Sequence, residues 1–159
     1  AIGLGAARSN NLGKATEALQ YMNRLQQKVT NPYWKTQIEI QKASIEAWID
    51  FAKSKREEAL QKMQLAAQQE AATNKHAVTP GELLPASELL GDMLLAMGKP
   101  ADAIVQYEAA LKRSPGRFNS IANAIVAAKG AGNKEKERHY TMLLTQLKKP
   151  VMKDVAYRQ

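Results

Sequence analysis

Residues 84–115 read LPASELLGDMLLAMGKPADAIVQYEAALKRSP, and the clearest structural signal of the chain lies here. Gly98 can take the left-handed backbone conformation that ends a helix, and Pro100 presets the backbone angle with which the next helix begins. On both sides of this turn, apolar residues recur at spacings of three and four, which is typical of helices with one buried face. The stretch therefore predicts two antiparallel helices, over 85–97 and 100–113, joined by a tight turn.

Helical spacing of apolar residues continues through the rest of the chain. All six prolines fall between such segments, and Asn31-Pro32 has the residue types favoured at a helix N-cap and at the first helical position. No segment has the alternating pattern of a strand. Further helices are predicted over 1–9, 13–29, 33–53, 56–72, 117–130 and 133–147. Because most connections are short, neighbouring helices must run antiparallel, and the predicted fold class is all-α, with about eight helices arranged as hairpins.

An internal repeat is also present. Small residues at Gly91 and Ala103 suit a close crossing of two helices, and Tyr107 fills the space beside them. Eight residues have the spacing of a tetratricopeptide repeat (TPR): Leu90, Gly91, Leu94, Gly98, Ala103, Tyr107, Ala110 and Pro115. The stretch therefore resembles the TPR family. This resemblance implies antiparallel hairpins stacked as a right-handed solenoid with a concave face.

Weaker copies of the pattern extend the resemblance along the chain. They are Gly13, Ala18, Met22 and Leu25; then Ala59, Met63 and Ala66; and, in degenerate form, Ile121, Ala124, Ala128 and Gly132. We therefore expect a single helical array over 1–147, followed by a basic C-terminal tail over 148–159. The array is expected to consist of a partial repeat (1–31), a long hairpin (32–74), an inserted loop (73–84), the TPR hairpin (85–115) and a degenerate terminal hairpin (117–147).

The inserted loop and the segment 117–120 give a further resemblance, to the C-terminal TPR region of larger bacterial proteins of unassigned function. Such proteins often carry an export signal, so a periplasmic or exported location and a cytoplasmic one both stay open. The chain starts at Ala1 without an initiator methionine. We expect that Ala1 is not the natural start and that any targeting segment lies upstream.

The net charge of +8 is concentrated near the C-terminus. Residues 1–110 carry equal numbers of acidic and basic side chains, whereas residues 111–159 hold 11 basic against three acidic ones. Such a field attracts nucleic acid, anionic lipid or an acidic peptide. Aromatic residues are not interleaved with the basic ones, so we do not expect nucleic acid as the main partner.

Residue types that catalyse reactions or bind metals are sparse. The chain has no cysteine and two histidines, His76 and His139, which are too far apart in sequence for a zinc motif. Gly3-Leu4-Gly5 lacks the third glycine and the preceding strand of a dinucleotide-binding loop. No apolar run reaches the roughly 20 residues that span a bilayer. We therefore expect no catalytic, cofactor-binding or metal-binding residues and no transmembrane segment.

The TPR resemblance places a candidate binding groove on the first helix of each hairpin, since these helices line the concave face of such arrays. The predicted groove residues are Ile45, Trp48, Glu88, Asp92, Asn119, Asn123 and Val126. The two asparagines could pair with a peptide backbone, whereas Trp48 has a second interpretation as a core residue. We predict a non-enzymatic scaffold that binds a protein or peptide partner, or a second copy of itself. Two alternatives stay open: electrostatic docking of the basic C-terminal half to nucleic acid or an anionic membrane, and a non-catalytic module of a larger enzyme.

Overall fold

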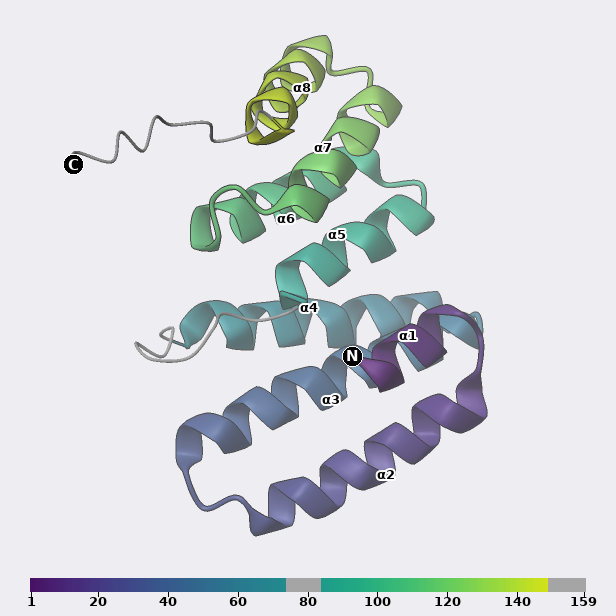
Figure 1. Cartoon of the computed structure of the whole chain (residues 1–159). Helices are drawn as coiled ribbons and strands as arrows, with labels where there is room; N and C mark the ends of the chain where they lie inside the picture. Colours follow the sequence, from purple (N-terminus) through teal and green to yellow (C-terminus); the bar gives the residue numbers. More distant parts are fainter. Residues whose placement is uncertain (74–83, 149–159) are drawn as a thin grey trace, which may run out of the picture.

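The computed structural model describes residues 1–73 and 84–148, and within them the chain forms eight helices and no strand. The helices are α1 (Ile2–Arg8), α2 (Leu12–Lys28), α3 (Pro32–Ala52), α4 (Arg56–Ala72), α5 (Ala86–Ala96), α6 (Pro100–Arg113), α7 (Phe118–Gly130) and α8 (Lys134–Lys148). They pair as four hairpins, α1–α2, α3–α4, α5–α6 and α7–α8, which follow one another up the array in Figure 1. The predicted all-α fold class is therefore confirmed.

Every predicted helix begins and ends within one residue of the observed one. Helix α3 begins as expected, because the side-chain oxygen of Asn31 accepts hydrogen bonds from the backbone N–H groups of Tyr33 (2.9 Å) and Trp34 (3.4 Å). Pro32 then occupies the first helical position. Most of the predicted inserted loop, with His76, and the predicted basic tail beyond Lys148 lie outside the described residues.

The four hairpins share one turn geometry. In each turn a single residue takes the left-handed conformation: Asn10 (φ 60°), Ser54 (64°), Gly98 (71°) and Gly132 (68°). The next residue donates its backbone N–H to the carbonyl five residues earlier, at 2.8–2.9 Å in all four turns. This is a common way to end a helix, because it satisfies carbonyls that lack a partner within the helix. The internal repeat thus has a counterpart in the backbone at every hairpin turn.

The observed turns show that the repeat pattern was aligned incorrectly with the sequence of the first hairpin. The repeat pattern places Gly13 at the turn and Ala18 in the small buried position beyond it, but Gly13 lies inside α2 and the turn residue is Asn10. Asparagine tolerates the left-handed conformation better than most residues, so a search for glycine selects the wrong position. The residue five positions beyond each of the first three turns is a fully buried alanine: Ala15, Ala59 and Ala103.

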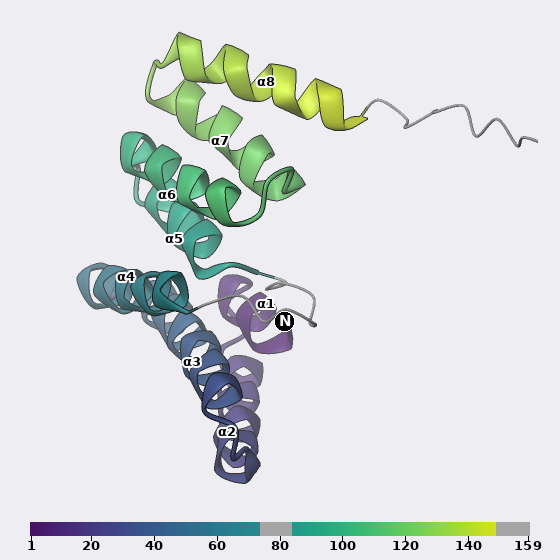
Figure 2. The ribbon, with the colours of Figure 1, turned by 90° about the vertical axis from the view of Figure 1, so that its left-hand side faces the viewer.

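The hairpins stack so that their first helices touch. Helix α1 contacts α3, α3 contacts α5, and α5 contacts α7, whereas α2, α4, α6 and α8 make no contact with one another in the described part of the chain. The second helices are therefore spread apart on the outer side of the array. Figure 2 shows the hairpins stacked one above another. We call the side formed by α1, α3, α5 and α7 the inner face.

A small residue allows the two helices of the third hairpin to cross closely. A Cβ atom placed on Gly91 would lie 2.7 Å from Cε1 of Tyr107, which is fully buried. The apolar side chains predicted from the repeat to pack around this crossing are all buried: Leu90, Leu94, Ala103, Tyr107 and Ala110. The close helix crossing predicted at Gly91 and Ala103, with Tyr107 filling the space beside them, is therefore present in the structure.

Candidate functional site

A polar cluster crosses the inner face and centres on Asp92 of α5. Its carboxylate accepts hydrogen bonds from the Tyr107 hydroxyl (2.8 Å) and the Asn123 amide nitrogen (2.9 Å), and it pairs with the Arg8 guanidinium (2.8 Å). Burial, followed by the charge of Asp92, raises the pKa of the Tyr107 hydroxyl well above its usual range, so this hydroxyl remains a donor. One carboxylate therefore joins four helices, α1, α5, α6 and α7, which belong to three different hairpins.

Arg8 also connects this cluster to Trp48 of α3. The guanidinium carbon lies 4.7 Å from the centroid of the Trp48 ring, a cation–π geometry. The ring packs edge to face against Phe51 and is only 6% exposed. Its indole nitrogen has no hydrogen-bond partner among the described residues. Trp48 is therefore a core residue that Arg8 covers, which agrees with the second interpretation of this residue.

Glu88 lies one turn before Asp92 and forms a second polar cluster. Its carboxylate is 2% exposed and accepts hydrogen bonds from Nε (2.6 Å) and Nη2 (3.0 Å) of Arg117. The hydroxyl of Ser120, itself fully buried, donates to the same carboxylate. Because a two-point ion pair restricts both position and orientation, Glu88 fixes the start of α7 against α5.

The structure divides the seven predicted groove residues into three groups. Ile45, Trp48 and Glu88 are buried, which corrects the expectation that they line a surface open to solvent. The reason is that neighbouring helices cover them: α1 lies over Ile45 and Trp48, and Arg117 lies over Glu88. Asp92 and Asn123 are partly buried and bond to each other, and the exposed members are Asn119 and Val126.

Sequence reasoning missed three of the five side chains that pair with the carboxylates of this face, namely Arg8, Arg117 and Ser120. Arg8 lies two hairpins away from Asp92 in sequence, and no local pattern marks it as a partner. Arg117 and Ser120 lie 29 and 32 residues from Glu88. Their pairing depends on how two consecutive hairpins stack, which helical periodicity alone does not specify.

A third polar cluster joins α6 and α8 through Glu108. Its carboxylate accepts hydrogen bonds from the Lys136 ammonium and the Tyr140 hydroxyl, both at 2.6 Å. Burial alone would raise the pKa of Glu108, but these two hydrogen bonds and the charge of Lys136 outweigh it and hold that pKa below its usual range. Burial and the same hydrogen bond raise the pKa of Tyr140. The carboxylate is thus kept in its charged form.

Replacing Glu108 with glutamine is expected to make stability less sensitive to acid. The folded pKa of Glu108 lies below the unfolded value of 4.5, so its stabilising contribution is present above that value and is lost as pH falls through the folded pKa. The difference in unfolding free energy between wild type and Glu108→Gln, measured by urea titration, should therefore become smaller as the pH is lowered from about 5 to about 3. Exposed Glu135→Gln is the control, and a pH-independent difference for Glu108→Gln would contradict the prediction.

Part of the C-terminal positive charge is neutralised within the fold. Lys134 pairs with Glu137 at 3.2 Å, and Lys129 lies 3.9 Å from the same carboxylate. Lys136 and Arg117 are held by the two glutamates described above. Arg117 and Lys136 thus join helices of different hairpins, whereas Lys129 and Lys134 stay largely exposed to solvent.

A metal-binding cluster and a membrane-spanning helix are both absent from the described part of the chain. In the described ranges, 1–73 and 84–148, no group of three or more histidine, cysteine, aspartate or glutamate side chains is placed to hold a metal ion. No helix in this part of the chain is both long enough and apolar enough to cross a membrane. Comparisons with protein-family models, curated proteins and solved structures found no match. The candidate site therefore rests on the geometry of the inner face.

Proposed function

We propose that the chain is a non-enzymatic scaffold, a right-handed TPR-like array that binds a protein or peptide partner on its inner face. The observation that carries the proposal is the turn shared by all four hairpins, with its left-handed residue at Asn10, Ser54, Gly98 and Gly132. Repeated hairpins stack into extended surfaces, and proteins of this architecture use such surfaces for binding. Contacts among the first helices support curvature toward the inner face.

Helix α7 supplies the accessible part of this surface. Val126 is 56% exposed, and Asn119 is exposed near the start of the same helix. Between them, Asn123 donates its amide nitrogen to Asp92 and keeps its amide oxygen as an acceptor. An apolar side chain in line with two amides suits an extended peptide that carries one apolar anchor. Because Arg8 and Arg117 already neutralise the acidic residues of this face, the ligand does not require a basic segment.

Val126→Glu is expected to weaken partner binding at least about tenfold, because a charge would replace the apolar anchor contact of the proposed surface. The matched control is Val105→Glu on α6, where the valine has nearly the same exposure, 57%, but lies on a second helix. A crosslinking pull-down with the intact protein in its native cells would compare both variants with wild type. The recovered partner would then be titrated against each purified variant.

The proposal requires that Val105→Glu retain the partner and that Val126→Glu lose it. Equal recovery by both variants would remove the α7 surface from consideration. If no stoichiometric partner is recovered and the purified protein is a monomer at all concentrations, the scaffold function itself is contradicted. Asn119→Ala tests the amide contribution and is expected to weaken binding by a smaller factor than Val126→Glu.

A further inference from the structure

The side chain of Arg8 reaches from α1 across α3 to α5. Its guanidinium lies 4.7 Å from the centroid of the Trp48 ring and 2.8 Å from Oδ2 of Asp92. Helix α1 itself packs on α2 and α3, and in the described part of the chain its backbone does not approach α5. The guanidinium thus lies in a site formed by an α3 ring and an α5 carboxylate, while other contacts hold α1 in place.

The carboxylate of this site is oriented independently of Arg8. Oδ1 of Asp92 accepts hydrogen bonds from the Tyr107 hydroxyl and the Asn123 amide nitrogen, whereas Oδ2 is the oxygen that pairs with Arg8. Because the two donors to Oδ1 come from α6 and α7, the carboxylate keeps its orientation when the guanidinium leaves. An acceptor that is already oriented binds a cation without the cost of ordering it.

The ring of the site is also fixed by its neighbours. Trp48 is buried and packs edge to face against Phe51, with the ring centroids 5.5 Å apart. An aromatic face beside a carboxylate suits a guanidinium, because this planar group stacks on the ring and donates N–H bonds from its edge. An ammonium is more strongly hydrated and does not stack, so the site favours arginine over lysine.

The site can be reached from solvent on the side of Arg8. The Arg8 side chain is 39% exposed, although it takes part in both an ion pair and a cation–π contact. A cavity of about 200 Å³ lies against Arg8, Trp48 and Phe51. Because an exposed member of an ion pair stays partly hydrated, little free energy opposes its release. A second cation therefore has room to approach the ring while Arg8 moves away.

We infer that Trp48 and Asp92 form a binding site for an arginine side chain of a partner protein, and that Arg8 occupies this site in the free chain. The partner's guanidinium would stack on the Trp48 ring and donate to Oδ2 of Asp92, the two contacts that Arg8 makes in the structure. Arg8 would then turn toward solvent. The argument for this occupant is that the site already holds a guanidinium, and the site includes no residue of the Val126 surface.

The test removes the internal occupant and supplies its head group in solution. Arg8→Ala empties the site, and the probe is ethylguanidinium, which has the planar cation of arginine. Trp34→Phe in all proteins leaves Trp48 as the only tryptophan, so its indole N–H gives a single NMR signal. We expect this signal to shift saturably with the probe in Arg8→Ala. N-ethylurea, which has a similar shape without the charge, should bind at least about tenfold more weakly.

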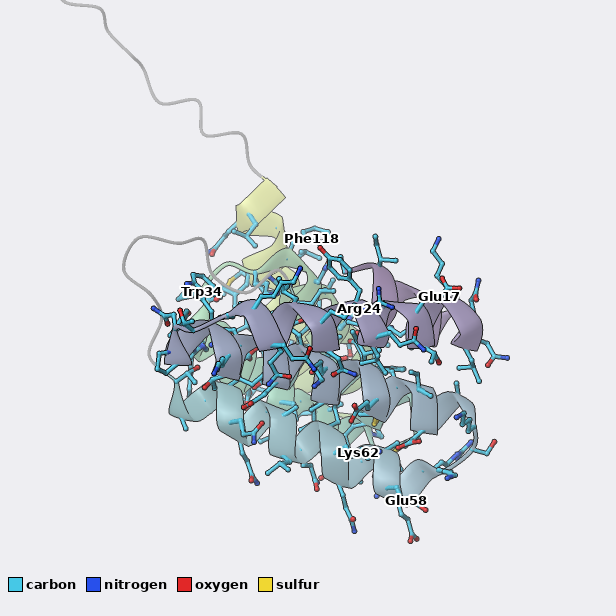
Figure 3. All side chains as sticks on the ribbon, turned by 90° about the horizontal axis from the view of Figure 1, so that it is seen from below. Glu17, Arg24, Trp34, Glu58, Lys62 and Phe118 are labelled. Carbon is cyan, nitrogen blue, oxygen red and sulfur yellow. The ribbon has the colours of Figure 1, made fainter. Side chains whose placement is uncertain are left out.

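Two further variants isolate the site. Asp92→Asn keeps the oxygen that accepts from Tyr107 and Asn123 but replaces Oδ2 with a donor, so the double variant with Arg8→Ala should lose probe binding. Lys62→Ala removes the similarly exposed cation of an ion pair between α4 and α3 (Figure 3) and should respond like the parent chain. As a second readout, the probe should raise the melting temperature of Arg8→Ala and not that of the double variant.

In the parent chain the probe must displace Arg8. The Nε–H signal of Arg8 should therefore shift saturably, with an apparent Kd at least about tenfold higher than that of Arg8→Ala, because the tethered side chain competes for the site.

Four results would overturn the inference. They are no saturable shift in Arg8→Ala, undiminished binding by the double variant, equal binding of N-ethylurea, and an Arg8 signal that stays fixed at every probe concentration that leaves the parent chain folded. The last result would make the contact of Arg8 with Asp92 a permanent structural pair. None of these measurements involves Val126 or a partner protein, so the arginine site and the α7 surface can fail separately.

Discussion

Replacing Glu88 with alanine is expected to lower the unfolding free energy by about 3 kcal/mol, the lower end of the range for breaking a buried ion pair. The carboxylate is buried and accepts hydrogen bonds from both Arg117 and Ser120. Its removal leaves a largely buried guanidinium without this counterion and a buried hydroxyl without its acceptor. Urea unfolding of the purified variant, followed by circular dichroism, measures the loss.

A control variant and a double-mutant cycle isolate the effect of the ion pair. Glu58→Ala removes an exposed glutamate from α4 and should change the unfolding free energy by less than about 0.5 kcal/mol (Figure 3). Arg117→Ala alone should be strongly destabilising, but the double variant with Glu88→Ala should lose less than the sum of the single losses. Additive losses would show that the two side chains are not coupled and that the pair does not fix α7 against α5.

Local signals were sufficient to predict the helices. Asn31-Pro32 starts α3, and Gly98 followed by Pro100 ends α5 and starts α6, because each residue type has a backbone preference that needs no distant partner. The buried side of α6 was equally predictable, since Ala103 and Tyr107 repeat at helical spacing. Fold class and helix boundaries therefore follow from the sequence.

The turn of the first hairpin was less predictable. Asn10 is left-handed, as is the serine at the second turn, although most non-glycine residues avoid this conformation. The hydrogen bonds that close each turn hold these residues in place, and they involve only backbone atoms. Glycine marks the turn at Gly98, but Gly13 lies inside a helix and two turns have no glycine, so glycine alone does not place a turn.

The candidate site was only partly predictable. The TPR resemblance implied that Asp92 and Asn123 lie on the same face, and the structure brings them within hydrogen-bond distance. Burial of Glu88 was missed, since a glutamate on a helix is usually exposed and its partner Arg117 belongs to the next hairpin. The contact of Arg8 with Asp92 depends on the stacking of whole hairpins. Such contacts require the tertiary arrangement, which local patterns do not contain.

Gly91→Leu is the second change with a large expected effect, a loss of about 1–3 kcal/mol in unfolding free energy. Even the first added carbon would lie 2.7 Å from the ring of Tyr107, and this ring is fully buried. The ring has little freedom to move aside, because its hydroxyl donates to Asp92. The leucine would therefore force α5 and α6 apart and strain the hydrogen bond at the centre of the inner face. Urea unfolding measures the loss.

Gly5→Ala shows whether steric crowding, and not the loss of a glycine, causes the effect. Gly5 lies inside α1, and a Cβ atom there would meet nothing within 4 Å, so alanine should stabilise the chain by about 0.5–1 kcal/mol through its higher helix propensity. The unfolding free energy should therefore rise for Gly5→Ala and fall for Gly91→Leu. If Gly91→Leu leaves stability unchanged, the close crossing of α5 and α6 is wrong, and the TPR-like register built on Gly91 and Ala103 is contradicted with it.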